Sequence, residues 1–395
     1  MDDTFSNKVR DLKPSAIREI FKYASDPSVI SLSAGNPAPE AFPKKEIANI
    51  SEKILSEDAV AALQYSVTEG YLPLRNRLKA YMKEKHQSYR GSDELIITSG
   101  ASQVMDLATK TLVNEGDVVL CESPSFIGSL NTFRSYGARL VGVPVEEDGI
   151  NLEKLEAALQ TEKRVRFLYI IPNFQNPSGV TMSLEKRKAV YALAKKYHIL
   201  ILEDNPYGDL RFSGDDIPTI KSLDEDGIVV YAGSFSKVLS PGLRVGFAIG
   251  PSAIIQKMVV CKQGQDVHTN IWSQMVTEAF MRDYDFESHL QRLRTLYRNK
   301  ANLAMKRLDL HLCPEVSYQP IEGGLFLWCC LPESIPMIEF CKRAVKNKVC
   351  VVPGNAFLAD EEELCSSFRI NFSTPTDEQL EIGIKRLRTT LDQMR

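Results

Sequence analysis

The chain has 395 residues, of which 44% are hydrophobic and 25% charged, a composition typical of a globular protein. The formal net charge is −3, so no basic excess indicates nucleic acid or an anionic membrane as the main partner. No apolar run approaches the roughly 18 residues that span a bilayer, and the first residues show no signal-peptide pattern. Eight cysteines without a CxxC pair favour reduced thiols, so we expect a cytoplasmic protein.

Short apolar segments alternate with segments of helical periodicity through the middle of the chain. Seven segments are predicted to be strands buried on both faces: 94–98, 118–121, 139–143, 167–171, 199–203, 228–231 and 245–249. Helical periodicity between them predicts helices, for example over residues 102–112 and 183–196. This alternation predicts an α/β fold with a mainly parallel sheet covered by helices.

The two ends of the chain have a different pattern. Five prolines before residue 45 predict an extended arm with one short helix. Beyond Ser273 the predicted elements are a charged helix over 286–308, strands near 324–331 and 368–372, and a last helix from Thr376. The predicted organisation is an N-terminal arm (1–45) that belongs to a small domain, a large α/β domain (46–284), and the α+β remainder of the small domain (285–395).

Several common site motifs are missing from the sequence. No GxGxxG follows a strand, and there is no Walker A loop and no HExxH. The five histidines are scattered without metal-ligand spacing, so we expect no metal site.

The strongest chemical signal is the segment GSFSKVLSPGLRVG over residues 233–246. Lys237 follows a predicted buried strand, with Ser234, Ser236 and Arg244 close by in sequence. A buried lysine near another cation loses proton affinity and becomes a nucleophilic amine at neutral pH. Hydroxyls and a guanidinium suit a phosphate dianion, and an amine beside a phosphate cradle is what pyridoxal phosphate (PLP) requires. A surface lysine in a serine-rich turn is the simpler alternative.

Three weaker signals also follow predicted strands. Asp204 ends an apolar strand, where its carboxylate could hold a protonated pyridine nitrogen, and Tyr207 follows in the same turn. Asn176 lies in a loop after another strand, and the turn 100–102 leads from a strand into a helix whose first amides could bind phosphate. Each signal alone is also compatible with an ordinary turn.

Together with LQYSVTEGY (63–71), GNPAPE (35–40) and SFRI (367–370), these segments resemble the class I/II aminotransferases of PLP fold type I. The resemblance is closest to the branch with 2-aminoadipate and kynurenine aminotransferases, and it covers nearly the whole chain from about Ser15. It implies a large domain with a mainly parallel seven-stranded sheet and a smaller α+β domain. It also implies PLP as cofactor and a homodimer with shared active sites.

The resemblance further assigns roles by position. Lys237, Asp204 and Tyr207 match the catalytic residues, Lys237 being the Schiff-base lysine and Asp204 the carboxylate on the pyridine nitrogen. For the cofactor ring, the resemblance implies Asn176 at the ring hydroxyl and Phe126 on the ring face, where close relatives usually have Tyr. The implied phosphate contacts are Gly100, Ala101, Ser102, Ser234, Ser236 and Arg244. Tyr65 is implied at the phosphate of the neighbouring subunit. The implied substrate contacts are Arg369 at the α-carboxylate, Gly35 and Asn176 near it, and Arg18 toward an acidic side chain.

The expected function is ping-pong transfer of an amino group from an L-amino acid to a 2-oxo acid, with 2-oxoglutarate as the expected acceptor. A C–S lyase or decarboxylase of the same fold stays open, because the cofactor performs the chemistry and the pocket selects the bond. A PLP-binding transcription regulator would need a DNA-binding module of roughly 60–70 residues ahead of the arm. Only about 14 residues precede Ser15, so we expect an enzyme. The donor stays open: Arg18 favours acidic or long polar side chains, but a helix that moves aside admits aromatic or aliphatic ones.

Overall fold

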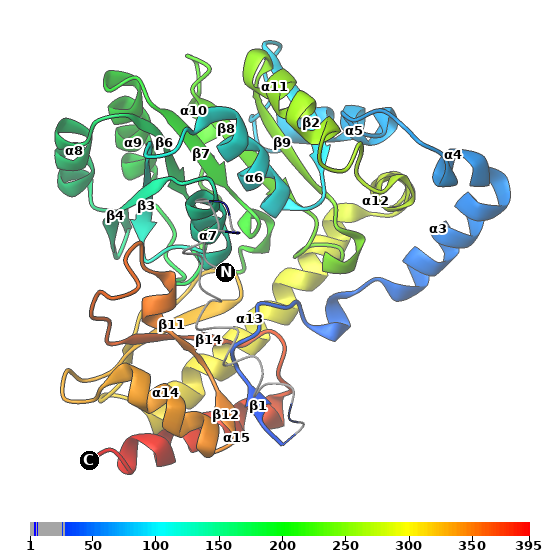
Figure 1. Cartoon of the computed structure of the whole chain (residues 1–395). Helices are drawn as coiled ribbons and strands as arrows, with labels where there is room; N and C mark the ends of the chain where they lie inside the picture. The colour runs from blue at the N-terminus through cyan, green and yellow to red at the C-terminus, as the bar shows by residue number, and fades with distance from the viewer. Residues whose placement is uncertain (1–3, 5, 7–25, 27) are drawn as a thin grey trace.

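A computed structural model of the chain describes residues 4, 6, 26 and 28–395. Most of the predicted N-terminal arm, including Arg18, therefore lies outside the described residues. Figure 1 shows a large α/β part and a smaller part that contains the C-terminal segments, with the long helix α13 (Phe286–His311) extending between them. Helices α3 (Lys44–Glu57) and α4 (Ala59–Leu63) project away from the rest of the chain.

The central sheet contains all seven predicted strands and, within the described residues, one further short strand. Its order is β2-β9-β8-β7-β6-β3-β4-β5. The pairs from β8 to β4 are parallel, whereas β9 is antiparallel to both neighbours and β5 is antiparallel to β4. The strands are β2 Asp93–Thr98, β3 Val118–Ser123, β4 Arg139–Glu146, β5 Gly149–Ile150, β6 Val165–Ile170, β7 Leu200–Asp204, β8 Val229–Ser234 and β9 Gly246–Pro251. The prediction of a mainly parallel sheet is confirmed, and β5 was missed because two residues carry no periodicity.

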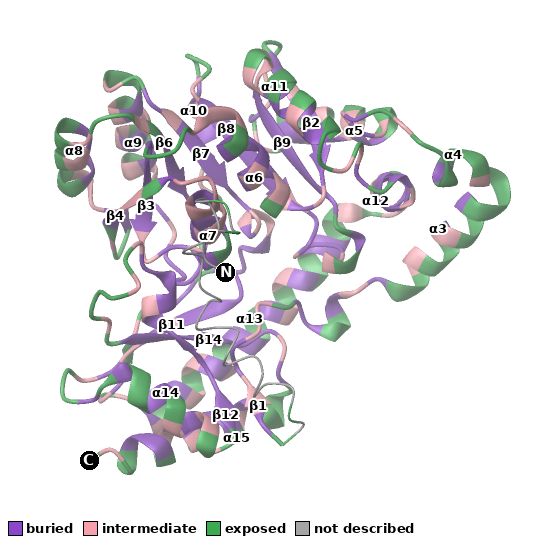
Figure 2. Cartoon of the chain, viewed as in Figure 1, coloured by how far each residue is buried: buried purple, intermediate pink, exposed green. Residues whose placement is uncertain are grey.

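Helices cover both faces of this sheet, and its central strands β3, β6, β7, β8 and β9 are largely buried (Figure 2). They are α5 Leu72–Glu84, α6 Ala101–Leu112, α7 Ile127–Ser135, α8 Leu152–Thr161, α9 Leu184–Lys196, α10 Ile220–Leu223, α11 Ser252–Gln263 and α12 Ile271–Asp283. Apolar side chains of α6, α7 and α11 pack on one face, and those of α8, α9 and α10 on the other. None of the helices in the described part of the chain combines the length and apolar character that a bilayer crossing requires.

The smaller part is built on an antiparallel sheet of order β10-β11-β14-β13. Its strands and helices are β10 Ser317–Tyr318, β11 Phe326–Cys330, β13 Val352–Pro353, β14 Ser367–Asn371, α14 Met337–Lys346 and α15 Asp377–Asp392. Helix α15 begins after Thr376, whose hydroxyl accepts the Gln379 amide in a capping box. The N-terminal strand β1 (Ile30–Ser31) pairs with β12 (Val349–Cys350), so the start of the described chain is joined to this part. Four 3₁₀ turns complete the described elements: η2 Pro39–Ala41, η3 Gly208–Leu210, η4 Pro241–Leu243 and η5 Gly354–Phe357.

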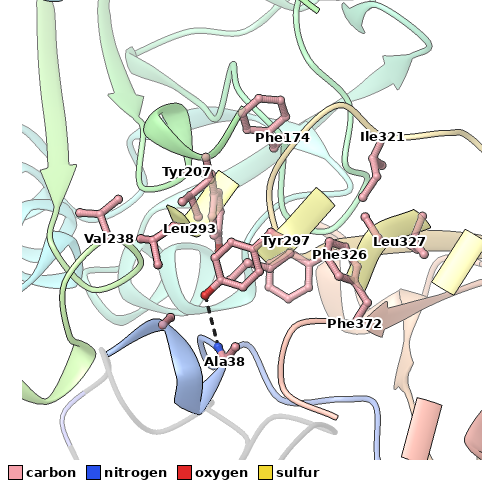
Figure 3. Packing of buried hydrophobic residues seen from close by; sticks show 14 of the residues in the cluster. Ala38, Phe174, Tyr207, Val238, Leu293, Tyr297, Ile321, Phe326, Leu327 and Phe372 are labelled. Atoms are coloured by element: carbon pink, nitrogen blue, oxygen red, sulfur yellow. Dashed lines mark hydrogen bonds between the residues drawn. The ribbon is translucent and has the colours of Figure 1, made fainter. Parts of the chain in front are cut away.

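One apolar cluster joins the two parts around α13 (Figure 3). Tyr297 of α13 is fully buried among side chains that include Phe326 and Phe372. Its hydroxyl accepts a hydrogen bond from the Ala38 amide at 3.2 Å. Burial of these large aromatic side chains gives a strong hydrophobic contribution, and the polar contact fixes the N-terminal segment against α13.

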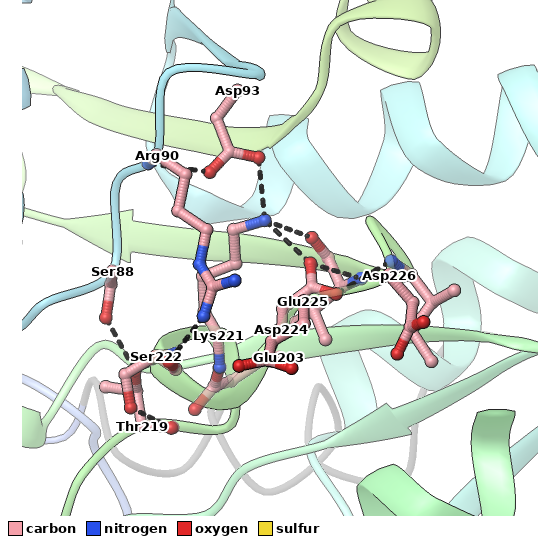
Figure 4. A network of polar contacts seen from close by, with 12 residues as sticks. Ser88, Arg90, Asp93, Glu203, Thr219, Lys221, Ser222, Asp224, Glu225 and Asp226 are labelled. Carbon is pink, nitrogen blue, oxygen red and sulfur yellow. Dashed lines mark hydrogen bonds and ion pairs between the residues drawn. The ribbon is translucent and has the colours of Figure 1, made fainter.

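A buried polar network fixes the end of β7 (Figure 4). Lys221 Nζ lies 2.8 Å from Asp93 and 2.9 Å from Asp224, and all three side chains are almost fully buried. The carboxylate of Glu203 accepts the Ile220 and Lys221 amides at 2.9 and 2.7 Å. Side chains alternate along a strand, so Glu203 anchors one face of β7 and the next residue, Asp204, points to the other face.

Candidate active site

The carboxyl ends of the parallel strands border a cavity of about 440 Å³. Ligands bind at this edge in open α/β sheets. The predicted site residues that line the cavity are Gly35, Ala101, Ser102, Phe126, Asn176, Asp204, Tyr207, Ser234, Ser236, Lys237, Arg244 and Arg369. Gly100 lies directly behind the Arg244 guanidinium, whereas Tyr65 is 80% exposed and is not part of the lining.

Lys237 lies in the tight connection between β8 and β9. The Phe235 amide donates to Val245 and the Leu239 amide to Phe235, which turns the chain directly after β8. Lys237 Nζ donates a hydrogen bond of 2.7 Å to the carbonyl oxygen of Gly35. Burial, together with the nearby cations Arg369 and Arg244, lowers the pKa of Lys237 to about 8. A substantial fraction of this amine is therefore neutral and nucleophilic near neutral pH.

Asp204 is the last residue of β7 and is buried. Its Oδ2 accepts a hydrogen bond of 2.8 Å from the Tyr169 hydroxyl, whereas its buried Oδ1 has no hydrogen-bond partner. Burial raises the pKa of Asp204 to about 7, and the Tyr169 hydrogen bond opposes this rise. A buried acceptor in the wall of a cavity suits a cationic N–H donor, such as a protonated pyridine nitrogen.

Arg369, in the middle of β14, carries the cavity's buried guanidinium. It donates to Asn176 Oδ1 at 2.8 Å and to the Ser33 carbonyl oxygen at 2.7 Å, and it lies 4.1 Å from the ring centroid of Phe326. Burial lowers its pKa to about 10, so it stays charged at neutral pH. Burial also raises the pKa of Tyr207 well above its ordinary value, so that hydroxyl stays a donor. A fixed guanidinium of this kind suits a carboxylate.

A second arginine of the cavity, Arg244, forms part of a cradle for an anion. Arg244 Nη2 donates to the Ser99 carbonyl oxygen at 2.9 Å, and Nη1 lies 3.5 Å from Ser236 Oγ. A Cβ atom on Gly100, whose φ is +80°, would lie 2.4 Å from Arg244 Nη2, and one on Gly246 would lie 2.6 Å from the Gly100 backbone. Only glycine allows this approach. Ala101 and Ser102, the first residues of α6, line the cavity, and the first amides of a helix have no acceptor within the helix, as in phosphate sites at helix N-termini.

The polar groups that line the cavity are those that PLP requires. They include a low-pKa amine, a buried acceptor without a partner, a phenol and an amide, and a cationic cradle at a helix N-terminus. No group of three His, Cys, Asp or Glu residues that could hold a metal ion occurs in the part of the chain that the structure describes.

Sequence reasoning missed several residues of the cavity and its surroundings. Met105, Ile127, Ser129 and Phe326 line it, and Tyr169 connects Ser129 to Asp204 by hydrogen bonds. Phe326 and Tyr169 fell within predicted strands, where an aromatic residue indicates core packing. Only the order of the strands reveals that they border the site.

Comparisons with known proteins agree with this geometry. The family described as aminotransferase class I and II matches residues 27–387. The chain is 37% identical over 393 residues to aromatic-amino-acid aminotransferase 1 of Thermococcus litoralis, covering 98% of this chain and 94% of that protein. It is 37% identical over 392 residues to 2-aminoadipate transaminase of Thermus thermophilus, covering 98% and 96%. The crystal structure of Pyrococcus horikoshii kynurenine aminotransferase, in complex with PMP, superposes with a TM-score of 0.95 at 35% identity, covering 99% and 98%.

The chain belongs to the class I and II aminotransferases. It is a PLP-dependent transaminase with the corresponding α/β fold, similar to the branch that contains aromatic, 2-aminoadipate and kynurenine aminotransferases. Its substrates are amino acids and 2-oxo acids. The predictions of family, fold, enzyme class and cofactor are therefore confirmed.

Proposed function

We propose that the enzyme transfers the amino group of an L-amino acid to 2-oxoglutarate in two half-reactions that share this cavity. The observation that carries the proposal is the combination in one cavity of the low-pKa amine of Lys237 and the buried, partnerless Oδ1 of Asp204. The substrates for which the relatives are named support a donor with an aromatic or a long acidic side chain.

Each group of the cavity has a defined task in this proposal. Bound PLP supplies an electrophilic carbonyl and a ring that withdraws electrons from the substrate Cα. Lys237 Nζ binds the cofactor and, once released by substrate, takes the proton from Cα and delivers it to the cofactor. Asp204 holds the ring nitrogen protonated, and Arg369 binds the α-carboxylate of amino acid and oxo acid alike.

The remaining contacts hold the cofactor in place. We propose that Asn176 and Tyr207 hydrogen-bond the ring hydroxyl and that Phe126 stacks on the ring. Arg244, Ser234, Ser236 and the turn over residues 100–102 are proposed to bind the phosphate. The contacts of Arg244 with Ser99 and Ser236, and the two glycines that allow them, support this assignment.

We also propose that the enzyme is a homodimer in which Tyr65 completes the phosphate site of the partner. The support is the exposed apolar surface of the projecting segment α3–α4 and the turn after it (Figures 1 and 2). Its exposed side chains are Leu55, Val60, Leu63, Tyr65, Val67 and Leu72. Several large apolar side chains exposed on one segment support a protein interface there.

Two further assignments extend the proposal. We infer that the arm (1–45) and residues 285–395 form the small domain and residues 46–284 the large one, which the pairing of β1 with β12 supports. We infer a cytoplasmic location, which fits the lack of disulfide bonds among the cysteines of the described residues.

A half-reaction tests the proposed function directly. The PLP-loaded enzyme is mixed with an amino acid without any acceptor, and the oxo acid formed is counted. We expect one oxo acid per active site, with PLP converted to pyridoxamine phosphate, and restoration of PLP when 2-oxoglutarate is added. Release of ammonia or carbon dioxide instead would indicate a lyase or a decarboxylase. A panel of donors in the same assay identifies the preferred side chain.

A further inference from the structure

The two oxygens of the Asp204 carboxylate have different surroundings. Oδ2 accepts the Tyr169 hydroxyl at 2.8 Å, whereas Oδ1 has no partner. Tyr169 lies on β6, opposite Leu202 of β7, so its side chain and that of Asp204 extend from the same face of the sheet. The Tyr169 contact therefore fixes the rotation of the carboxylate and leaves Oδ1 for a bound group.

The Tyr169 hydroxyl is itself held in place. Ser129 of α7 donates its hydroxyl proton to the Tyr169 oxygen at 2.8 Å, and both side chains are buried. Since the Tyr169 oxygen accepts from Ser129, its single proton is directed to Asp204. The Tyr169 ring also packs edge-on against Phe133, with 5.1 Å between ring centroids. The result is a chain of two hydrogen bonds in which Ser129 donates to Tyr169 and Tyr169 donates to Asp204.

We propose that Tyr169, held by Ser129, is a positioning residue that keeps Asp204 ionised and oriented toward the pyridine nitrogen of PLP. The inference rests on the proposed role of Asp204. A buried carboxylate is costly without hydrogen bonds to its charged form, and the contacts described for Asp204 include only this one. Without it, the proton shared with the pyridine nitrogen would move toward Asp204, and the ring would withdraw electrons less strongly.

The nearby Glu122 does not replace this function. It follows Cys121 on β3 and accepts the Ile171 amide at 2.8 Å and the Gln175 side chain at 3.3 Å. Burial raises the pKa of Glu122 to about 8, and the charge of Asp204 adds to that rise. Glu122 is therefore largely neutral at pH 7, and the Tyr169 hydrogen bond is the described contact that favours the charged form of Asp204 against burial.

The test uses the wild-type enzyme and the variants Tyr169→Phe, Ser129→Ala and Tyr231→Phe, each loaded with PLP labelled with ¹⁵N in the ring. Tyr231→Phe is the matched control, because it removes another buried hydroxyl of the same sheet, which contacts Asn205 and not Asp204. The ¹⁵N chemical shift reports the protonation of the ring nitrogen, and titration of the apoenzyme gives the dissociation constant of PLP. Neither readout depends on turnover.

We expect a protonated ring nitrogen in the wild type and in Tyr231→Phe. In Tyr169→Phe the shift should move toward neutral pyridine and the dissociation constant should rise about tenfold, since a hydrogen bond to a charged group is lost. Ser129→Ala should change the ¹⁵N shift and the dissociation constant in the same direction by a smaller amount. This variant tests the proposal if Tyr169→Phe does not fold.

The proposal is overturned if the folded Tyr169→Phe keeps the wild-type ¹⁵N shift and affinity, or if Tyr231→Phe changes both equally. If Tyr169→Phe does not fold, wild-type values for Ser129→Ala overturn it. A wild-type enzyme that binds no PLP at Lys237 would instead refute the proposed function, so the two failures are distinguishable.

Discussion

Lys237 Nζ donates a hydrogen bond to the carbonyl oxygen of Gly35 at 2.7 Å, across 202 positions of the chain. Gly35 belongs to the N-terminal segment that is held against α13 and joined to the smaller part by the pairing of β1 with β12, whereas Lys237 follows a strand of the large sheet. The contact therefore links the two parts of the molecule at the amine that we propose to react. In the proposed function Lys237 binds the cofactor, and its nitrogen is then no longer available to hold Gly35 in this way.

Replacing Lys237 by Ala is expected to reduce transamination by at least about 1,000-fold, because the group that moves the proton is lost. The visible absorbance of the lysine-bound cofactor should disappear. Borohydride treatment of the wild type followed by peptide mapping should place the cofactor on Lys237. Lys257→Ala, on an exposed position of α11, is the control. Normal turnover of Lys237→Ala would contradict the assignment.

The pH dependence of cofactor uptake follows from the pKa of Lys237. Burial and the two nearby arginines lower this pKa from 10.5 to about 8. The neutral amine is the nucleophile, so the rate at which the apoenzyme incorporates PLP should rise with pH through about 8 and level off above it. Stopped-flow absorbance between pH 6.5 and 9.5 measures this profile. A rate that still rises steeply at pH 9.5 would indicate an ordinary lysine.

Arg369→Lys is expected to lower kcat/KM for amino donor and oxo-acid acceptor alike by about 100-fold, since the planar fork that binds a carboxylate is lost while the charge stays. PLP affinity should change less, because Arg369 is not among the residues proposed to hold the cofactor and reaches it only through its contact with Asn176. Steady-state kinetics with both substrates, together with PLP titration, separates these effects. An effect on only one of the two substrates would contradict the proposed role.

The double substitution Val60→Glu and Leu63→Glu on α4 tests the proposed dimer. Both side chains are more than three-quarters exposed in the isolated chain, so the substitutions should leave the fold intact and place charges in the interface. Analytical ultracentrifugation should show the mass fall from two chains to one, with weaker PLP binding if Tyr65 serves the partner. Leu364→Glu, an exposed apolar position far along the chain, should stay dimeric. An unchanged mass for the double variant would refute this interface.

Lys221→Met should reduce the free energy of unfolding by about 3–5 kcal/mol, because Asp93 and Asp224 would be left buried without their cation. Lys195→Met is the matched control: its ion pair with Asp226 is exposed and should contribute at most about 1 kcal/mol. Urea denaturation of the apoenzymes measures both. Equal effects of the two substitutions would show that burial of the Lys221 network is unimportant for stability.

The sequence alone determined the longer strands, the main helices and the nature of the chemistry, whereas the two-residue strands were missed. Buried strands of a parallel sheet are continuous apolar runs, so Phe167–Ile171 and Ile199–Glu203 were predicted within one or two residues of β6 and β7. The lysine, the carboxylate and the phosphate turn were found because each directly follows such a run. Local pattern is enough for these features, since they depend on neighbours in the chain.

Only the tertiary structure decided which distant groups meet. Tyr169 and Ser129 carry no local sign of a contact with Asp204, because the contact requires β6 beside β7 and α7 packed over them. The link between Lys237 and Gly35 likewise requires the N-terminal segment to fold back and pair with β12 of the smaller part. Such contacts depend on strand order and on helix packing. The periodicity of two or 3.6 residues in a sequence shows which face of an element is buried, but it does not show which other element packs against that face.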